Sequence, residues 1–330
     1  MRIFLTGATG FVGRNYLEWV LREQPEAQIT CLVRDPRKAA EQWPDQPRQV
    51  HWLVGDLLQP HTYQKELEQA ELVLHAAALV SLRNGPEFYA QNTEATQQLL
   101  SGLAHSTHLQ RLVFVSSISA IDRAPEILAV GPLTEAAHPH PNTDYGRSKR
   151  QAEEDVQISG LPHVIMRPAY IYGAYPRPNS SMDRMAQHVL SGKPYTRFPF
   201  PGRASAIYAD DLSEMLWVAG YHPAVENQAF FISDPEPVLT RQAFADLAQA
   251  MRIPFEALSL NESAVSRTHR YLLQSQPENM LVRILFEDYF YCSPNRWFER
   301  TGTSIRYGDA EGLSRTIDWM RRQKRLPLAE

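Results

Sequence analysis

The chain has 330 residues, which is enough for one or two domains with a sizeable buried core. Hydrophobic residues make up 43% and charged residues 21%, and no apolar run is long enough to cross a bilayer, so the composition excludes a disordered or membrane-spanning chain. The net charge of −4 gives no support to nucleic acid as a partner.

Cysteine and histidine usage narrows the class further. Cys31 and Cys292 are far apart and form no paired motif, so we expect inert thiols in a reducing, cytoplasmic location. The 11 histidines show no metal-ligand spacing, and we predict no metal site. The chain enters its first apolar segment at once, so we also expect no signal peptide.

A strand, a glycine turn and a helix are predicted at the start of the chain. Arg2–Thr6 is a short apolar run, Gly7, Gly10 and Gly13 follow at intervals of three, and a helical pattern begins at Phe11. Such a turn brings backbone N–H groups and the positive end of a helix close to a pyrophosphate. It therefore predicts a dinucleotide-binding loop, and the alternative is an ordinary strand–helix turn packed by glycines.

Apolar runs continue to alternate with helical stretches as far as Arg167. This alternation is typical of an α/β fold, here a Rossmann doubly wound parallel sheet covered by helices on both faces. The further strands are predicted at Gln28–Val33, Gln49–Val54, Leu72–Ala76, Leu112–Ser116 and His163–Arg167. The long helices are predicted at Pro86–His105 and Asp144–Ser159, the second with Glu153 and Glu154 on a solvated face.

The pattern after Arg167 is less regular. Loops are predicted at Ala174–Ser181 and Pro194–Gly202, a strand turning into a helix at Ile207–Ala219, and further helices at Gln242–Arg252 and Gly312–Arg322. We divide the chain into a dinucleotide-binding domain, residues 1–170, to which residues 204–220 return, and a smaller C-terminal region, mainly residues 171–330. Ligands of open α/β sheets bind at the carboxyl ends of the strands, so this region should cap the cofactor and shape the substrate pocket.

Candidate catalytic residues follow the fifth strand. Tyr145 and Lys149 are four apart on a predicted helix and share one face. An ammonium group near a phenol favours phenolate, so the lysine should lower the pKa of the tyrosine and let it exchange a proton with a carbonyl or alcohol oxygen. Ser117 closes the strand where it can hold that oxygen, with Ser119 as the second candidate. The alternative is a solvent-exposed Tyr and Lys and a pair of strand-ending serines.

Taken in order, these signals resemble the extended short-chain dehydrogenase/reductase family, also described as the NAD(P)-dependent epimerase/dehydratase family. The resemblance covers nearly the whole chain, from Thr6-Gly-Ala-Thr-Gly-Phe-Val-Gly13 to a C-terminal helix at Gly312–Trp319. It implies Ser117, Tyr145 and Lys149 as the catalytic triad. It also implies cofactor contacts at Gly7, Thr9, Gly10, Phe11, Val12, Gly13, Asp56, Leu57, Ala76, Ala77, Ala78, Asn92, Tyr145, Lys149 and Pro168. The acidic pair of dehydratases is absent beside Ser117.

The residues at the end of the second predicted strand indicate whether the cofactor is NAD or NADP. An acidic residue there accepts hydrogen bonds from the ribose 2′-OH of NAD, whereas an arginine pairs with the 2′-phosphate of NADP. Arg34 is in this position, followed by Asp35, whose side chain we expect Pro36 to turn away. The segment also resembles dihydroflavonol-reductase-like members, so we predict NADP(H), with NAD as the alternative.

The substrate is less well defined by the sequence. Aromatic residues gather after the sixth strand and favour a fairly hydrophobic substrate: Tyr170, Tyr172, Tyr175, Tyr195, Phe198 and Phe200. Residues 289–320 resemble 3β-hydroxysteroid-dehydrogenase-like members, which also favours a hydrophobic substrate. A nucleotide sugar would need cations for its pyrophosphate, and candidates are Arg177, Arg184, Lys193, Arg197 and Arg203.

We therefore predict an NADP(H)-dependent oxidoreductase of EC 1.1.1 type, which reduces a ketone or aldehyde or oxidises the matching secondary alcohol. The alternatives are a nucleotide-sugar epimerase or reductase with tightly bound NAD, and a non-catalytic dinucleotide-sensing protein. The resemblance also implies a homodimer formed through the two long helices.

Overall fold

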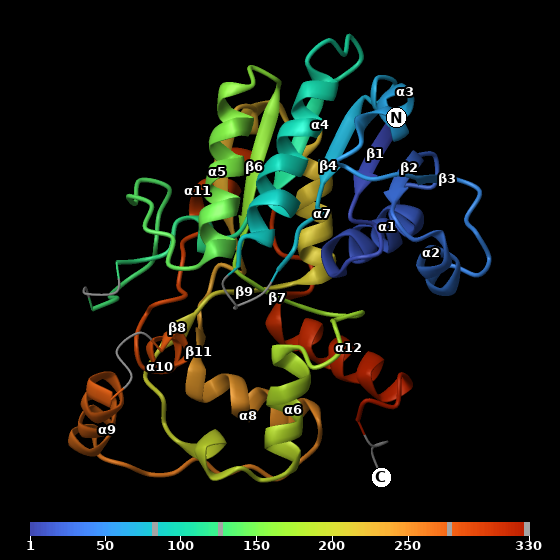
Figure 1. Cartoon of the computed structure of the whole chain (residues 1–330). Coiled ribbons are helices and arrows are strands. Elements are labelled where there is room, and N and C mark those ends of the chain that lie inside the picture. The colour runs from blue at the N-terminus through green and yellow to red at the C-terminus, as the bar shows by residue number, and fades with distance from the viewer. Residues whose placement is uncertain (81–84, 125–127, 276–278, 327–330) are drawn as a thin grey trace.

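The computed structural model describes residues 1–80, 85–124, 128–275 and 279–326. Within these residues a sheet of seven strands, all paired in parallel, lies between two layers of helices (Figure 1). Its strands in spatial order are β10 (Gln228–Ile232), β6 (His163–Pro168), β5 (Arg111–Val115), β4 (Leu72–His75), β1 (Arg2–Thr6), β2 (Gln28–Val33) and β3 (Val50–Val54). This order, which reverses between β1 and β4, confirms the predicted doubly wound fold.

Each face of the sheet packs against its own apolar cluster. One cluster joins the sheet to α1 (Phe11–Glu23), α7 (Ala209–Ala219) and α11 (Asn295–Thr301). The other joins it to α3 (Gln64–Leu67), α4 (Ala95–Leu103) and α5 (Asp144–Ile158). Both faces are buried, which explains why strands such as β5 are apolar along their whole length.

The C-terminal region forms a separate apolar cluster below the carboxyl ends of the strands (Figure 1). Its helices are α6 (Ser181–Leu190), α8 (Thr240–Ala250), α9 (Glu262–Ser275), α10 (Met280–Phe286) and α12 (Gly308–Arg322). Two small strand pairs, β7 (Tyr170–Tyr172) with β9 (Ala206–Tyr208) and β8 (Arg203–Ala204) with β11 (Val238–Leu239), connect it to the sheet.

The structure departs from the predicted elements in several places. Strand β10 completes the sheet from a segment for which we predicted no strand. The predicted helix Pro86–His105 is divided into a π-helical turn, Tyr89–Glu94, and α4. No helix in the described part of the chain is long and apolar enough to cross a membrane.

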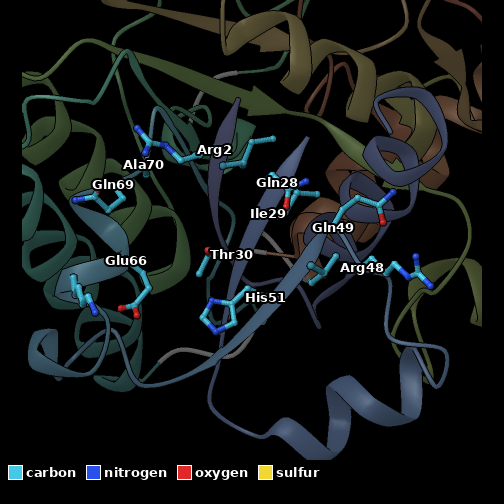
Figure 2. A pocket seen from close by; sticks show the side chains of 13 residues that line it. Arg2, Gln28, Ile29, Thr30, Arg48, Gln49, His51, Glu66, Gln69 and Ala70 are labelled. Carbon is cyan, nitrogen blue, oxygen red and sulfur yellow. The ribbon is translucent and has the colours of Figure 1, made fainter. Parts of the chain in front are cut away.

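A cavity of about 470 Å³ opens at the amino ends of β1, β2 and β3 (Figure 2). Arg2, Gln28, Val50 and Lys65 are among the residues that line it. The glycine loop follows the opposite, carboxyl end of β1, so this cavity is not the predicted cofactor site.

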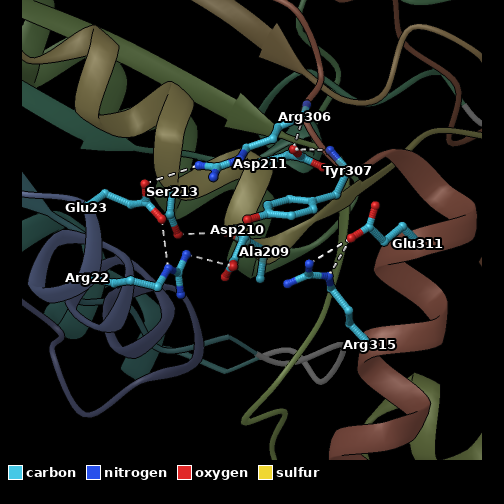
Figure 3. A network of polar contacts seen from close by, with 10 residues as sticks. All are labelled: Arg22, Glu23, Ala209, Asp210, Asp211, Ser213, Arg306, Tyr307, Glu311 and Arg315. Atoms are coloured by element: carbon cyan, nitrogen blue, oxygen red, sulfur yellow. Dashed lines mark hydrogen bonds and ion pairs between the residues drawn. The ribbon is translucent and has the colours of Figure 1, made fainter.

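A carboxylate at the start of α7 holds the C-terminal region to the sheet domain (Figure 3). Asp211 is 3% exposed and accepts hydrogen bonds from the backbone N–H groups of Arg306, Tyr307 and Gly308, at 3.0, 3.1 and 3.2 Å. Its neighbour Asp210 forms an ion pair of 3.0 Å with the half-exposed Arg22 of α1. Asp211 therefore determines where α12 begins, while Asp210 makes a surface contact.

We expect Asp211→Ala to lower the free energy of unfolding by about 2–4 kcal/mol, because it removes a buried acceptor and leaves three part-buried backbone N–H groups without their partner. Asp210→Ala is the matched control and should cost less than about 1 kcal/mol, as exposed ion pairs do. Urea denaturation followed by circular dichroism compares the two. Equal losses would show that the hydrogen bonds to Asp211 do not hold the C-terminal region.

Candidate active site

The glycine turn after β1 is a close contact between three backbone segments. Gly7 has φ +79°, and a Cβ there would lie 2.6 Å from the backbone nitrogen of Ala77, which follows β4. A Cβ on Gly13 would lie 2.2 Å from the carbonyl oxygen of Gly7. The backbone N–H of Gly10 donates to that same oxygen at 2.8 Å. Side chains at Gly7 and Gly13 would push apart β1, the loop after β4 and the first turn of α1.

The first turn of α1 is well suited to an anion. Gly10 is its N-cap and offers no side-chain acceptor, and the turn carries no acidic residue. The N–H groups at Phe11 and Val12 therefore meet no side-chain cap, and the helix dipole adds positive potential there. This cradle fits the pyrophosphate of a dinucleotide.

Arg34 and Asp35 follow β2, and their side chains point in different directions. Asp35 is the N-cap of α2 (Pro36–Gln42), and its carboxylate accepts hydrogen bonds from the backbone N–H and the Nε of Arg37, at 3.0 and 3.1 Å. These contacts with Arg37 hold the Asp35 carboxylate against the start of α2. Arg34 is exposed, and its Nη1 donates to the Oε1 of Gln91 at 3.0 Å.

Asp56 and Leu57 follow β3 and are held in a turn. One carboxylate oxygen of Asp56 accepts from the backbone N–H of Leu58 at 3.0 Å. Its own backbone N–H donates to Thr62 Oγ1 at 3.2 Å, and Tyr63 OH donates to the carbonyl of Leu57 at 3.0 Å. The turn presents a partly exposed carboxylate at the same edge of the sheet as Arg34.

His75 joins the carboxyl ends of the two central strands. Its Nδ1 is 2.7 Å from Thr6 Oγ1 and its Nε2 is 3.0 Å from Thr96 Oγ1 on α4. Thr6 Oγ1 also accepts from the backbone N–H of Ala77 at 3.2 Å. Burial, and secondarily the charge of Lys149, lowers the pKa of His75 to about 3, so the ring is neutral. The segment from Ala76 to Ala78 is partly exposed at this edge.

Asn92 fastens the loop after β4 to α5. It lies in the π-helical turn and is 1% exposed. Its amide accepts from the backbone N–H of Leu79 at 2.7 Å and donates to the carbonyl of Leu79 at 3.0 Å and to Ser148 Oγ at 2.9 Å. All three bonds of the Asn92 amide are to protein groups. We therefore expect Asn92 to affect a bound cofactor only indirectly, by fixing the loop after β4 and α5.

Ser117 lies just after the end of β5, and Tyr145 lies at the start of α5. The N-cap Thr143 starts α5, and Tyr145 lies in its first turn. Ser117 Oγ accepts from the backbone N–H of Ser119 at 3.1 Å. The same hydroxyl is close enough to the Tyr145 phenol to affect its pKa. Burial raises the pKa of the Tyr145 phenol, whereas the Ser117 hydroxyl and the charge of Arg177 lower it.

Gly146 is a residue that the sequence interpretation missed. A Cβ at this position would lie 2.3 Å from the carbonyl oxygen of Ser119, in the short turn after Ser117. Only a residue without a side chain lets α5 come this close to the turn. The glycine inside Tyr145-Gly-Arg-Ser-Lys149 was the available signal.

Lys149 lies one turn further along α5 and is 1% exposed. Its Nζ is 4.0 Å from the centre of the Phe114 ring. Burial lowers the pKa of Lys149 to about 7, against a smaller opposing effect of Glu153. The groups that lower the pKa of Tyr145 in this structure are Ser117 and Arg177, and the tuning of the phenol by Lys149 stays a prediction.

Pro168 ends β6, where its neighbour Arg167 binds α5. Arg167 Nε and Nη2 donate to the two carboxylate oxygens of Glu153 at 2.9 and 2.7 Å. Glu153 is fully buried, so its predicted place on a solvated face is wrong. A paired charge is tolerated there because the guanidinium satisfies both oxygens.

Most of the aromatic residues after the sixth strand belong to the packing of the C-terminal region. Phe198, Phe200 and Phe286 contact one another with ring centroids 4.8–5.6 Å apart. The hydroxyl of Tyr172 donates to Asp309 at 2.8 Å. Among the described residues there is no group of three or more His, Cys, Asp or Glu side chains placed to hold a metal ion.

A nucleotide-binding α/β fold with these glycines, and with a Tyr and Lys on the helix after β5, is typical of dinucleotide-dependent enzymes. The model of the NAD dependent epimerase/dehydratase family matches residues 3–232, so the chain belongs to this family. The predicted family is thereby confirmed, and with it a nicotinamide dinucleotide cofactor.

Relatives within the family carry out different reactions. The chain is 26% identical to a UDP-glucose 4-epimerase of Vibrio cholerae over 265 residues, 76% of each chain. It is 30% identical over 181 residues, 53% of its own length and 51% of the relative's, to a 4-hydroxy-2-methyl-3-oxo-4-farnesyl-3,4-dihydroquinoline-1-oxide ketoreductase of Stigmatella aurantiaca. The fold is similar to that of UDP-glucuronic acid 4-epimerase from Bacillus cereus solved with NAD, with a TM-score of 0.77, 18% identity, and 98% and 99% of the two chains covered.

The pKa of Lys149 predicts how stability changes with pH. It is about 7 in the folded protein and near 10.5 as a model value, so between these values the unfolded chain binds more protons. Stability therefore rises with pH through this window and lacks this gain below it. Relative to wild type, Lys149→Met should be most stabilising below about pH 7 and lose that advantage towards pH 10.

Urea denaturation of the cofactor-free proteins across this range measures the difference. Lys65→Met removes an exposed lysine of α3 and serves as the control. Parallel stability profiles for wild type and Lys149→Met would contradict a buried, deprotonating lysine.

Proposed function

We propose that the protein is an NADP(H)-dependent reductase of ketones or aldehydes, or the matching alcohol dehydrogenase, with Ser117, Tyr145 and Lys149 as its catalytic residues. The observation that carries this proposal is the close approach of α5 to the turn after Ser117, which brings Tyr145 to the end of β5, one helical turn before the buried Lys149. The ketoreductase relative supports the same class of reaction.

The nicotinamide, when bound, supplies or accepts the hydride at the carbonyl carbon. Ser117 donates a hydrogen bond that holds the carbonyl oxygen beside the phenol. Tyr145 donates its proton to that oxygen in reduction and takes it back in oxidation. Lys149, with a pKa of about 7, holds the ribose and exchanges a proton at Nζ near neutral pH.

The glycine turn, Asp56 and the loop at Ala76–Ala78 would hold the dinucleotide along the carboxyl edge of the sheet. The preference for NADP rests on Arg34, which is exposed beyond β2, and on Asp35, whose carboxylate is turned onto α2. An available guanidinium and an engaged carboxylate together favour a 2′-phosphate over a free 2′-OH.

A nucleotide-sugar epimerase with tightly bound NAD is the second candidate, favoured by the match to UDP-glucose 4-epimerase over 76% of the chain. Of the cations that a pyrophosphate would need, Arg203 is already paired with Asp288. Arg184, in α6, donates to the carbonyl of Asn179 in the preceding loop at 2.7 Å. The epimerase would retain NAD on purification and turn over without net oxidation of added cofactor.

A homodimer through α4 and α5 remains our expectation, to be measured by light scattering.

Replacing the proposed proton donor separates binding from chemistry. We expect Tyr145→Phe to lower kcat with a panel of carbonyl compounds by about 10²-fold or more, because no proton reaches the oxygen. The affinity for NADPH, measured by its fluorescence, should change little. Retained turnover in this variant would refute the role of Tyr145.

Replacing Arg34 tests the cofactor. Arg34→Gln should weaken NADPH binding by about tenfold or more and leave NADH binding nearly unchanged, since only NADPH carries the 2′-phosphate. Arg37→Gln is the matched control, because the guanidinium of Arg37 is paired with Asp35. A preference of the wild type for NADH would overturn the assignment.

A further inference from the structure

The loop between β7 and α6 is fixed to the sheet domain on one side of the site. Asn15 Nδ2, in α1, donates to the carbonyl of Ala174 at 2.8 Å. The guanidinium of Arg14 lies 3.5 Å from the centre of the Tyr175 ring. Tyr175 adopts φ +61°, an uncommon conformation for a residue with a side chain. The contacts that offset the energetic cost of this conformation hold the loop in one arrangement.

The same loop is fixed again at its far end. Arg325 Nη1 donates to the carbonyl of Pro176 at 3.2 Å. Ser180 and Asp183 then form a capping box that starts α6. The backbone of Arg177, between these two anchors, is therefore held in place although its side chain is exposed.

Arg177 reaches from this loop to the segment after β4. Its Nη1 donates to the carbonyl of Val80 at 2.7 Å. A neutral carbonyl leaves the charge uncompensated and most of the guanidinium N–H groups available. Because Val80 follows the loop at Ala76–Ala78, this bond places the guanidinium at the carboxyl edge of the sheet, and its charge lowers the pKa of Tyr145.

Other arginines nearby are compensated. Arg14 lies 3.9 Å from Glu18, Arg203 is paired with Asp288, and Arg325 with Asp183. No ion pair to Arg177 is found among the residues that the structure describes. A rigidly presented guanidinium without a carboxylate partner is the arrangement that binds a carboxylate or phosphate from outside.

We propose that Arg177 is a specificity-determining residue, which binds a negatively charged group of the substrate beside Tyr145. The proposal rests on the proposed carbonyl chemistry and specifies its substrate class: a carbonyl compound that carries an anionic group. That group is a carboxylate on the carbonyl compound itself or the diphosphate of an attached nucleotide.

Paired probes test the carboxylate. Acetophenone and 4-acetylbenzoate share an aryl ketone and differ in one carboxylate, and reduction of each is followed by consumption of NADPH. The wild type should favour 4-acetylbenzoate in kcat/KM, and Arg177→Gln should lower this preference by about tenfold or more. Any effect of Arg177 through the phenol acts on both ketones, so the ratio isolates recognition of the anion.

UDP tests the diphosphate. Its affinity for the NADPH-loaded protein, and that of 4-acetylbenzoate, is measured by calorimetry, which requires no turnover. Arg177→Gln should weaken one of the two probes by about tenfold or more, and Arg177→Lys should restore part of the loss. Arg315→Gln, which removes a half-exposed cation of α12 that is paired with Glu311, is the control and should leave both affinities unchanged.

The outcomes separate the two proposals. If acetophenone is reduced and neither probe responds to Arg177→Gln, the inference about Arg177 fails and the proposed function stands. If neither ketone is reduced but a probe binds in an Arg177-dependent way, the anion site stands and the carbonyl reductase does not. Weaker binding of NADPH itself in Arg177→Gln, with unchanged probe binding, would assign Arg177 to the cofactor and overturn the inference.

Discussion

The close approach of α5 to the end of β5 is the constraint on which the rest of the site depends. Gly146 makes it sterically possible, because any side chain there would meet the carbonyl of Ser119. Two buried polar contacts then fix the helix: Glu153 with Arg167 of β6, and Ser148 with Asn92. The position of Tyr145 at the end of β5 is thus a consequence of helix placement, which is set by buried groups further along α5.

The same buried network reaches the cofactor side of the site. Thr96 Oγ1 donates to the backbone carbonyl of Asn92 and is hydrogen-bonded to His75 Nε2. His75 Nδ1 is in turn hydrogen-bonded to Thr6 Oγ1, at the end of β1. Each member is nearly inaccessible to water, so an unpaired partner would be costly. The neutral state of His75 belongs to this arrangement, because a protonated ring could not accept from either threonine. The glycine turn and the candidate catalytic helix therefore share one polar framework.

The parts that the sequence predicts well depend on neighbours along the chain. The glycine turn, the central strands and the pairing of Tyr145 with Lys149 on one helical face are of this kind. Glu153 was misplaced because its partner Arg167 lies 14 residues away on a strand, a relation that helical spacing does not contain. Strand β10 was missed because its five residues become a strand only through pairing with β6. The roles of the candidate site residues remain predictions.

The burial of Lys149 shows most clearly how position and chemistry separate. Its place four residues after Tyr145 follows from the sequence, yet its Nζ lies over Phe114 and its pKa is about 7. A lysine near neutrality is a weak electrostatic partner for a phenol, but a ready site for a proton at physiological pH. The positive charge that does act on Tyr145 comes from Arg177, on a loop anchored to α1 and to the C-terminal region. If Arg177 and Tyr145 act as proposed, the second region controls the position of a charge that affects the proton donor, which would link substrate recognition to the reacting group.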